Sequence, residues 1–443
     1  MVQVFGDAVP IDGPDAISAA HPLTRRHVFA ATIGNALEFY DFITYGFFAI
    51  QIGHAFFPAG NAYASLMLSL ATFGAGFLTR PLGGLLIGIY ADRVGRRPAM
   101  MLSFMMMGAS IAALALLPTY AEIGVAAPVL AVLARMVQGF SLGGEVGPTT
   151  AYLLESAAVE KRGLIVSWQG ASQAIATATA GLVGVVLATN LSAAALDSYG
   201  WRIALLLGAA ILPFGLWVRR NLPETLHAHE SHPATQTTAE TGLAIARENM
   251  RIIVLGLLLL ASGAVSTQVF NYFTTFAQNT LHLAGNISFA ATVTFGGVAS
   301  IAVLCGGALS DRLGRRPLII SGQFAALVLT YPVFSWIVTV RSATALLAGV
   351  AILAVSAVGA GAVQVAITES LPKRIRGSAF AVIYATAIGV FGGSTQLVIT
   401  WLIHVTGSPL APAWVLFGAT TVGLGTVLFL RESAPARRVH SAA

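Results

Sequence analysis

The sequence predicts an all-α membrane protein whose twelve transmembrane helices form two pseudo-symmetric halves of six. Three observations lead to this fold class: the composition, the length of the apolar runs, and a motif that occurs twice. Of the 443 residues, 56% are hydrophobic and only 9% are charged, whereas about 25% of an ordinary soluble chain is charged. A soluble fold would have too little polar surface, so we expect the chain to lie in a lipid bilayer.

The apolar runs are long enough to cross a bilayer as helices, which takes about 20 residues for each span. A membrane β-strand would instead show about 10 residues of alternating polarity, a pattern that these unbroken runs lack. Twelve runs meet the helical requirement: 27–57, 63–90, 98–118, 124–153, 164–190, 201–219, 251–280, 286–309, 317–339, 343–368, 377–405 and 411–430.

Basic residues predict the orientation of these spans. If the N-terminus is cytoplasmic, most of the 24 Lys and Arg residues fall on that side, and only Arg202 and Arg341 fall on the other. Because Lys and Arg concentrate in cytoplasmic loops, we expect a multi-pass protein of the cell inner (plasma) membrane with both termini in the cytoplasm. The net charge of +6 then reflects topology, and no nucleic-acid partner is predicted.

A polar segment divides the chain. Residues 220–250 form the longest polar stretch inside it and contain His227, His229 and His232. We interpret this stretch as a solvated cytoplasmic linker and predict no metal site in it. The predicted organisation is a cytoplasmic N-terminal segment, a six-helix bundle, the linker, a second six-helix bundle and a cytoplasmic tail: 1–26, 27–219, 220–250, 251–430 and 431–443.

The two halves repeat one motif, G-x-x-x-D-R-x-G-R-R-P. It occurs in GIYADRVGRRPAM (88–100) and GGALSDRLGRRPLI (306–319), each time at the turn between the second and third span of its half. Glycine allows a tight turn. An aspartate at a helix end can pair with arginines or accept hydrogen bonds from the N-terminal amides of a neighbouring helix. We therefore predict a releasable cytoplasmic gate rather than a plain basic turn, formed by Asp92, Arg93, Gly95, Arg96, Arg97, Asp311, Arg312, Gly314, Arg315 and Arg316.

Ionisable residues inside the predicted spans are concentrated in the first half. An intramembrane carboxylate costs roughly 2.5 to 3.5 kcal/mol at the helix centre, so each such residue is a functional candidate. The stretch GNALEFYDF (34–42) contains two carboxylates, and helical spacing groups them with two neutral polar residues in one predicted stripe that faces a central cavity. The stripe consists of Asn35, Glu38, Asp41 and Tyr45, and the other ionisable residues of this half are Arg80, Arg135 and Glu145.

The second half offers neutral polar groups instead. Its predicted spans contain no comparable charge until Glu369, which lies near a cytoplasmic end. The neutral donors and acceptors are Gln268, Asn271, Tyr272, Gln278, Gln364 and Gln396. The two halves are therefore predicted to differ chemically.

Six plus six spans with this repeated turn resemble the major facilitator superfamily. GNALEFYDF, RPLGGLLIGIYADRVGRR (80–97) and RMVQGFSLGGEVG (135–147) are similar to the signature of its metabolite:proton symporters. Within that group, SWQGASQ (167–173), TESLPKRIRG (368–377) and ATAIGVFGGST (385–395) are most similar to citrate–proton symporters. The chain departs from the pattern at Tyr40, where Phe is usual, at Gln396, where Pro is expected, and in VFNYFTTFAQNT (269–280).

The charges and the resemblance together predict two groups of site residues. Asp41 or Glu38 can exchange a proton beside an arginine, and the resemblance implies a coupling role for Arg135. Arg80, roughly 12 Å from the end of its span by the helical rise, can hold a carboxylate bidentately or pair with Glu38 or Asp41. The predicted proton-coupling residues are Asp41, Glu38, Arg135 and Glu145. The predicted substrate-binding residues are Arg80, Asn35, Tyr45, Gln138, Gln169, Gln173, Asn271, Tyr272 and Gln364.

The sequence predicts a secondary transporter rather than an enzyme. It contains no Walker A pattern and no ligand cluster with zinc spacing, so we expect no catalytic residue, metal or cofactor, and a proton gradient as the driving force. The resemblance implies uptake of an anionic carboxylate together with protons, with citrate or a related tri- or dicarboxylate first. We expect a monomer, although the sequence leaves the oligomeric state open. Shikimate, oxoglutarate or betaine stay open as substrates, and so do a proton-antiport exporter and a ligand sensor without flux.

Overall fold

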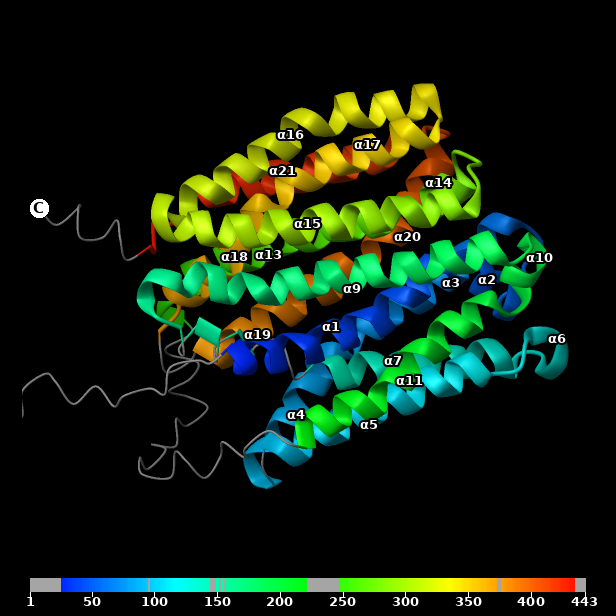
Figure 1. The fold of residues 1–443 in the computed structure, drawn as a ribbon, viewed down its shortest axis with the longest axis horizontal. Coiled ribbons are helices and arrows are strands. Elements are labelled where there is room, and N and C mark those ends of the chain that lie inside the picture. The colour runs from blue at the N-terminus through cyan, green and yellow to red at the C-terminus, as the bar shows by residue number, and fades with distance from the viewer. Residues whose placement is uncertain are drawn as a thin grey trace, which may run out of the picture.

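The computed structural model describes residues 25–94, 96–143, 149–150, 153–154, 157–220, 247–372 and 376–434, and every regular element in these ranges is helical. Figure 1 shows the helices as an elongated bundle. Twelve long helical segments follow one another through the described ranges. They are α1–α2 (Arg25–Phe47, Ala49–Phe56), α3–α4 (Ala62–Leu78, Arg80–Val94), α5 (Arg96–Leu116), α7 (Ala126–Leu142), α9 (Arg162–Asn190), α11 (Trp201–Arg220), α13–α14 (Met250–Asn271, Phe273–Asn279), α15 (Gly285–Leu313), α16 (Arg315–Val340), α17–α18 (Ala343–Ala354, Ala360–Ser370), α19–α20 (Arg376–Thr386, Gly393–Thr406) and α21 (Ala411–Leu428). Shorter elements are α6 (Tyr120–Ile123), α10 (Ala193–Ala195), η1 (Val159–Lys161), η2 (Leu196–Gly200), η4 (Val355–Gly359) and η5 (Ala387–Gly392).

The predicted fold class is confirmed. By length and hydropathy alone, eight of the described helices qualify as membrane spans, and two shorter apolar helices lie within α5 and α7. The helices follow the predicted runs closely, and the run 27–57, for example, folds as α1 and α2. The domain boundaries stay predictions, because the segments 1–26, 220–250 and 431–443 lie largely outside the described residues.

Local sequence sets several helix starts and turns. The side chain of Asn61 accepts a hydrogen bond from the Ala64 N–H at the start of α3, and Ser342 does the same for the Ala345 N–H at the start of α17. Both satisfy amides that a helix start leaves without a partner. Between α15 and α16, Gly314 adopts a φ of +105°, a conformation that glycine reaches without a side-chain clash. The glycine of the second motif copy therefore forms the tight turn that the sequence predicts.

Two groups of helices lie side by side in the bundle. We call α1 to α11 the N-half and α13 to α21 the C-half, and α9 and α15 run along each other where the halves meet (Figure 1). Small residues bring these two helices together, since a Cβ on Gly296 would lie 2.5 Å from the carbonyl oxygen of Ala174. A second contact joins α3 to α20, where a Cβ on Gly74 would lie 2.8 Å from the carbonyl oxygen of Gly393. Glycine allows helix backbones to approach this closely within a membrane.

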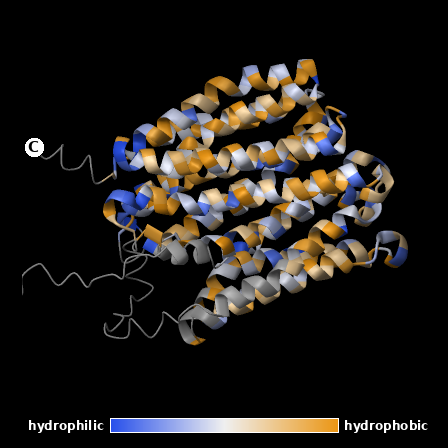
Figure 2. Cartoon of the chain, viewed as in Figure 1, coloured by the Kyte–Doolittle hydropathy of each residue, from blue (hydrophilic) through white to orange (hydrophobic). Residues whose placement is uncertain are grey.

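The surface of the bundle is apolar along its length and polar at its ends. Large hydrophobic side chains such as Leu85, Ile301 and Val382 are 59%, 66% and 66% exposed, which suits a surface that lipid covers. Figure 2 shows hydrophilic residues concentrated at the end that holds the α15–α16 turn and the start of α9. We call this the motif end, and the opposite end, which holds α6 and α10, the far end.

The halves also touch at the far end. Gln51 of α2 donates a hydrogen bond of 3.4 Å from Nε2 to Oε1 of Gln278 in α14. The ring of Tyr63 stacks on that of His404, with centroids 3.7 Å apart and planes 14° apart. Because each contact pairs one residue of the N-half with one of the C-half, separating the halves at this end requires both contacts to break.

One prediction concerns the packing of α7 against α3 and α4. A Cβ on Gly139 would overlap the carbonyl oxygen of Gly76, and a Cβ on Gly83 would overlap that of Phe140. Gly139→Val should therefore displace backbone, at a typical overpacking cost of about 1–3 kcal/mol or more, and lower both the melting temperature and the yield of monodisperse protein in detergent. Gly418→Val is the matched control, because a Cβ there meets nothing within 4 Å. Equal behaviour of the two variants would contradict this account.

Candidate functional site

The N-half buries two arginines against one aromatic ring. The Cζ atoms of Arg80 and Arg135 lie 4.3 Å and 4.4 Å from the ring centroid of Phe42. Arg80 also lies over Phe77, at 4.5 Å, and the side chains of both arginines are at most 5% exposed. A guanidinium over an aromatic face gains a cation–π attraction, which grows when water is excluded. The distance between the two Cζ atoms therefore cannot exceed the sum of their distances to the Phe42 ring centroid.

Arg135 has one polar partner and several free N–H groups. Its Nη1 donates to Oε1 of Gln138, and its Cζ lies 4.5 Å from the Tyr45 ring and 5.2 Å from the Phe73 ring. Its Nε and Nη2, like Nε2 of Gln138, have no hydrogen-bond partner among the described residues. A buried donor without a partner costs free energy, so an acceptor such as a carboxylate placed beside these groups would be stabilised.

Arg80 is shared between the two halves. It interacts electrostatically with Glu38 of α1 and with Tyr384 of α19, and its Nε has no hydrogen-bond partner within the described ranges. The Tyr384 hydroxyl in turn accepts a hydrogen bond of 3.5 Å from Nε2 of Gln173 in α9. Tyr384 was not among the predicted site residues, and its signal in the sequence was a phenol hydroxyl within the largely apolar run AFAVIYATA (379–387). The structure brings it to Arg80 because α19 packs against α4.

Asp41 lies apart from this cluster. A Cβ on Gly208 of α11 would overlap Oδ1 of Asp41, so the carboxylate faces the interior of the N-half. The preceding residue supports this placement, since the Tyr40 hydroxyl donates to the carbonyl oxygen of Ala204 at 3.1 Å. Oδ1 of Asp41 is buried without a hydrogen-bond partner in the part of the chain that the structure describes. That oxygen is a free position for a proton.

The predicted stripe on α1 therefore divides among several neighbours. Asn35 donates to the carbonyl oxygen of Gln169 at 3.1 Å and to the Ser172 hydroxyl at 2.7 Å, both on α9. Tyr45 donates to the carbonyl oxygen of Ser69 on α3 at 3.3 Å. Along α1, Asn35 therefore faces α9, Glu38 lies near Arg80 of α4, and Asp41 faces α11. With Tyr45 against α3, the four residues of the stripe do not share one environment.

The C-half contributes neutral polar pairs between α13 and α20. Nε2 of Gln396 donates to Oε1 of Gln268 at 2.9 Å, and the Thr400 hydroxyl donates to the Tyr272 hydroxyl at 2.9 Å. Oδ1 of Asn271 is buried without a hydrogen-bond partner among the residues described, and so is Oε1 of Gln364 on α18. Gln396 was outside the predicted substrate-binding group, although the sequence had marked it as a departure from the citrate pattern.

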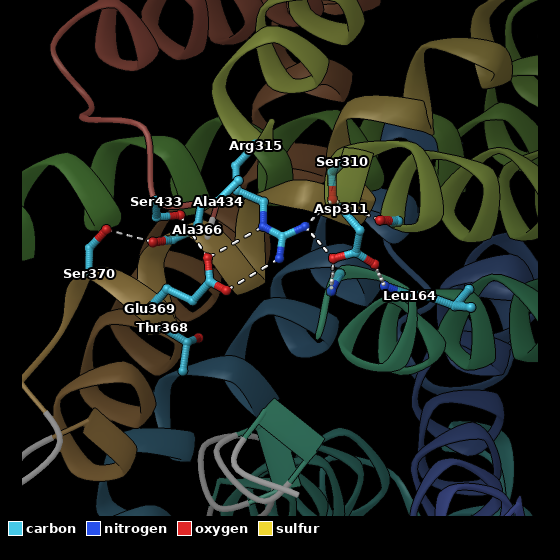
Figure 3. Close-up of polar contacts among 12 residues, drawn as sticks. Leu164, Ser310, Asp311, Arg315, Ala366, Thr368, Glu369, Ser370, Ser433 and Ala434 are labelled. Carbon is cyan, nitrogen blue, oxygen red and sulfur yellow. Dashed lines mark hydrogen bonds and ion pairs between the residues drawn. The ribbon is translucent and has the colours of Figure 1, made fainter. Parts of the chain in front are cut away.

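At the motif end, Arg315 joins two carboxylates (Figure 3). Its Nη1 lies 2.7 Å from Oδ1 of Asp311, and its Nη2 lies 3.2 Å from Oε1 of Glu369. The exposed fractions of these side chains are 1%, 7% and 6%. Glu432 accepts hydrogen bonds from the backbone N–H groups of Arg315 and Arg316. The α16 N-terminus is therefore held by carboxylates from two distant segments, neither of which was part of the predicted gate.

Asp311 also connects the two halves. Its carboxylate accepts hydrogen bonds from the backbone N–H groups of Gly163 and Leu164, at 2.8 Å and 3.0 Å, in the first turn of α9 (Figure 3). The start of a helix presents unpaired amides and a partial positive charge, so a carboxylate is favoured there. Asp311 thus accepts hydrogen bonds from the N-terminal amides of a neighbouring helix, and its role in a cytoplasmic gate stays a prediction. Arg312 is exposed, and Nη2 of Arg316 donates to the carbonyl oxygen of Leu428.

The first copy of the motif is only partly visible. Asp92 and Arg93 belong to α4, and Arg96 and Arg97 belong to α5. Their side chains lie outside the part of the structure that is described, as do Gly95 and Glu145. Their predicted roles stay predictions.

Comparison with known proteins identifies the class. Residues 31–394 match the family model of the Major Facilitator Superfamily. The chain therefore belongs to this superfamily of membrane transporters. Its fold is similar to the crystal structure of a D-xylose-proton symporter, with a TM-score of 0.74 and 20% sequence identity over 93% of this chain and 98% of that one. At this identity the likeness shows the fold alone.

Two curated relatives are nearer in sequence. The chain is 37% identical over 412 residues to a citrate-proton symporter of Salmonella typhi, covering 92% of this chain and 94% of that protein. It is 36% identical over 391 residues to the alpha-ketoglutarate permease of Escherichia coli (strain K12), covering 85% and 87%. The predicted family and the predicted similarity to citrate–proton symporters are confirmed.

One prediction concerns Tyr384, which interacts electrostatically with Arg80 from the other half. Tyr384→Phe removes one hydroxyl and leaves the buried ring, so the protein should fold with an unchanged melting temperature. Beside Arg80 this hydroxyl can donate to an anion bound there; losing a hydrogen bond to a charged group costs about 1.5–3 kcal/mol, so the KM for a transported anion should rise about tenfold or more. Tyr331→Phe on the exposed face of α16 is the control. An unchanged KM would exclude Tyr384 from the anion site.

A second prediction concerns Asp311. Asp311→Asn keeps the shape of the side chain but places an amide N–H₂ opposite one of the α9 N–H groups. It also removes the negative charge that pairs with the buried guanidinium of Arg315. Removing one partner of a buried ion pair costs about 3–5 kcal/mol, so the melting temperature and the uptake rate should both fall. Asp197→Asn breaks an exposed pair with His54 and should change neither. A loss in both variants alike would contradict a specific role for the motif-end contact.

Proposed function

We propose that this protein takes up an anionic carboxylate together with protons, by alternating access of its two halves. The observation that carries the proposal is the pair of buried arginines with unpaired N–H groups beside the contact between the halves. A carboxylate ligand would supply both the countercharge and the missing acceptors, and bidentate pairing suits a guanidinium. Citrate is the first candidate, and 2-oxoglutarate is the second, because relatives named for each are similar over most of the chain.

Proton coupling is assigned to the carboxylates of α1. Glu38 lies within electrostatic reach of Arg80, and a substrate carboxylate that binds Arg80 competes with Glu38 for the same cation. Asp41, one turn farther along α1, lies against α11 with one oxygen unpaired among the described residues. Binding of the anion changes the charge around α1, and a proton on one of these carboxylates offsets that change. This arrangement supports a coupled process, whereas cationic drugs would be repelled by the two arginines.

The remaining expectations complete the proposal. The motif end faces the cytoplasm, as the distribution of basic residues predicts, in an inner (plasma) membrane. The contact of Asp311 with α9 closes that end while the far end opens, and it is released when substrate enters the cell. A proton gradient drives the cycle without a cofactor, and the working unit is a monomer.

Reconstituted uptake tests the proposal. Proteoliposomes with an inward proton gradient should accumulate labelled citrate, and an uncoupler should abolish the accumulation. Asp41→Asn, which matches the carboxylate in shape, should abolish accumulation while citrate exchange across the membrane continues. Accumulation by the variant would move coupling to Glu38. Absence of citrate uptake by folded wild-type protein, with 2-oxoglutarate uptake instead, would replace citrate by the second candidate, and absence of both would reject carboxylate symport.

A further inference from the structure

Two polar pairs form a ladder between α13 and α20. Gln268 pairs with Gln396, and one helical turn farther along both helices Tyr272 pairs with Thr400. All four side chains are at most 6% exposed. Residues four apart share one face of a helix, so the ladder fixes which faces of the α13–α14 segment and α20 meet, and within it the Gln396 amide donates to Gln268.

This ladder leaves two acceptor oxygens without donors. Oε1 of Gln396 has no hydrogen-bond partner within the described ranges, and Oδ1 of Asn271 has none either. The exposed fractions of these side chains are 1% and 3%. Asn271 follows Gln268 by three residues, which places it near the same face of α13. Native structures rarely leave buried polar atoms unpaired, and such exceptions call for a functional explanation.

Gln396 lies where the C-half touches the arginine cluster of the N-half. Its Nε2 lies 3.6 Å from the position that a Cβ on Gly46 of α1 would take, and the Phe73 ring lies 3.3 Å from that same position. Arg135 stands 5.2 Å from the centroid of Phe73. The Gln396 amide of the C-half and the Arg135 guanidinium of the N-half therefore both lie in the neighbourhood of Phe73.

The two halves thus present opposite hydrogen-bonding character. The N-half presents cationic donors, which fit carboxylates. In the C-half, Gln396 and Asn271 present neutral acceptor oxygens, which a carboxylate cannot satisfy because it carries no proton. A hydroxyl can donate to such an oxygen. We propose that Gln396, with Asn271, recognises a hydroxyl on the substrate, so that the protein selects hydroxylated carboxylates over their deoxy counterparts. This inference rests on the proposed function and specifies its substrate class.

A matched pair of ligands tests the inference. Propane-1,2,3-tricarboxylate is citrate without its hydroxyl, so competition against labelled citrate uptake isolates that one group. Leaving a buried acceptor unpaired costs about tenfold or more in affinity, so unlabelled citrate should inhibit at a concentration at least about tenfold lower than its deoxy analogue. Malate should likewise compete better than succinate. Equal inhibition within both pairs would overturn the inference.

A variant assigns the discrimination to Gln396. Gln396→Leu removes the amide. The ratio of the inhibitory concentrations of the deoxy analogue and citrate should fall to about one, chiefly because citrate binds less tightly. The preference is a ratio measured within one preparation, so it is independent of the amount of folded protein. Gln323→Leu is the control, because Gln323 packs against Gly423 between α16 and α21 and should keep the wild-type ratio. A wild-type ratio in Gln396→Leu would overturn the assignment, and Asn271→Leu tests the second acceptor in the same way.

The outcomes separate the two proposals. Citrate uptake with no preference for the hydroxyl would leave proton-coupled carboxylate symport intact and reject only the role of the C-half acceptors. No uptake of any carboxylate would reject the proposed function itself, and the inference with it. Should Gln396→Leu fail to fold, the wild-type comparison of the two ligand pairs alone still decides the substrate class.

Discussion

Two guanidinium groups lie on one aromatic ring inside the bundle, and their burial limits how the rest of the site can work. A buried ion carries a desolvation penalty of several kcal/mol unless other groups compensate for it. Here the compensation comes from the faces of Phe42, Phe77 and Tyr45, from Gln138, and from electrostatic contact with Glu38. These contacts stabilise the cations and leave several N–H groups free within the described structure. An anion that enters therefore finds cations already desolvated and oriented.

The chemical inequality of the halves fits a protein whose halves move against each other. The charged groups of the central region belong to the N-half, whereas the C-half meets them with the hydroxyl of Tyr384 and the amide of Gln396. The hydrogen bond that joins the halves here runs from Gln173 to Tyr384, two neutral groups; such a bond contributes only about 0.5–1.5 kcal/mol net, so it can break without a large penalty. If an ion pair crossed the interface instead, each cycle would have to separate two buried charges.

The motif end follows the same logic. Arg315 and its partners Asp311, Ser310 and Glu369 all belong to the C-half, so this charged cluster moves as one unit. Among the described contacts of this cluster, the two bonds from the backbone amides of Gly163 and Leu164 to Asp311 are the ones that cross between the halves. Opening this contact therefore breaks two charge-assisted hydrogen bonds while the buried ion pairs remain intact. A ligand that binds one conformation better can shift an equilibrium of this size.

Composition, apolar run length and the repeated turn were enough to establish the fold class, the twelve helices and the ionisable candidates, because a bilayer admits few solutions for so apolar a chain. Periodicity along α1 could not decide the environment of each carboxylate. Asp41 faces Gly208 of α11 and Glu38 lies near Arg80, since the neighbours of a helix depend on packing between segments far apart in sequence. Tyr384, Glu369 and Glu432 went unselected for the same reason: an isolated hydroxyl or carboxylate acquires a partner only when α19, α18 or the segment after α21 folds against it.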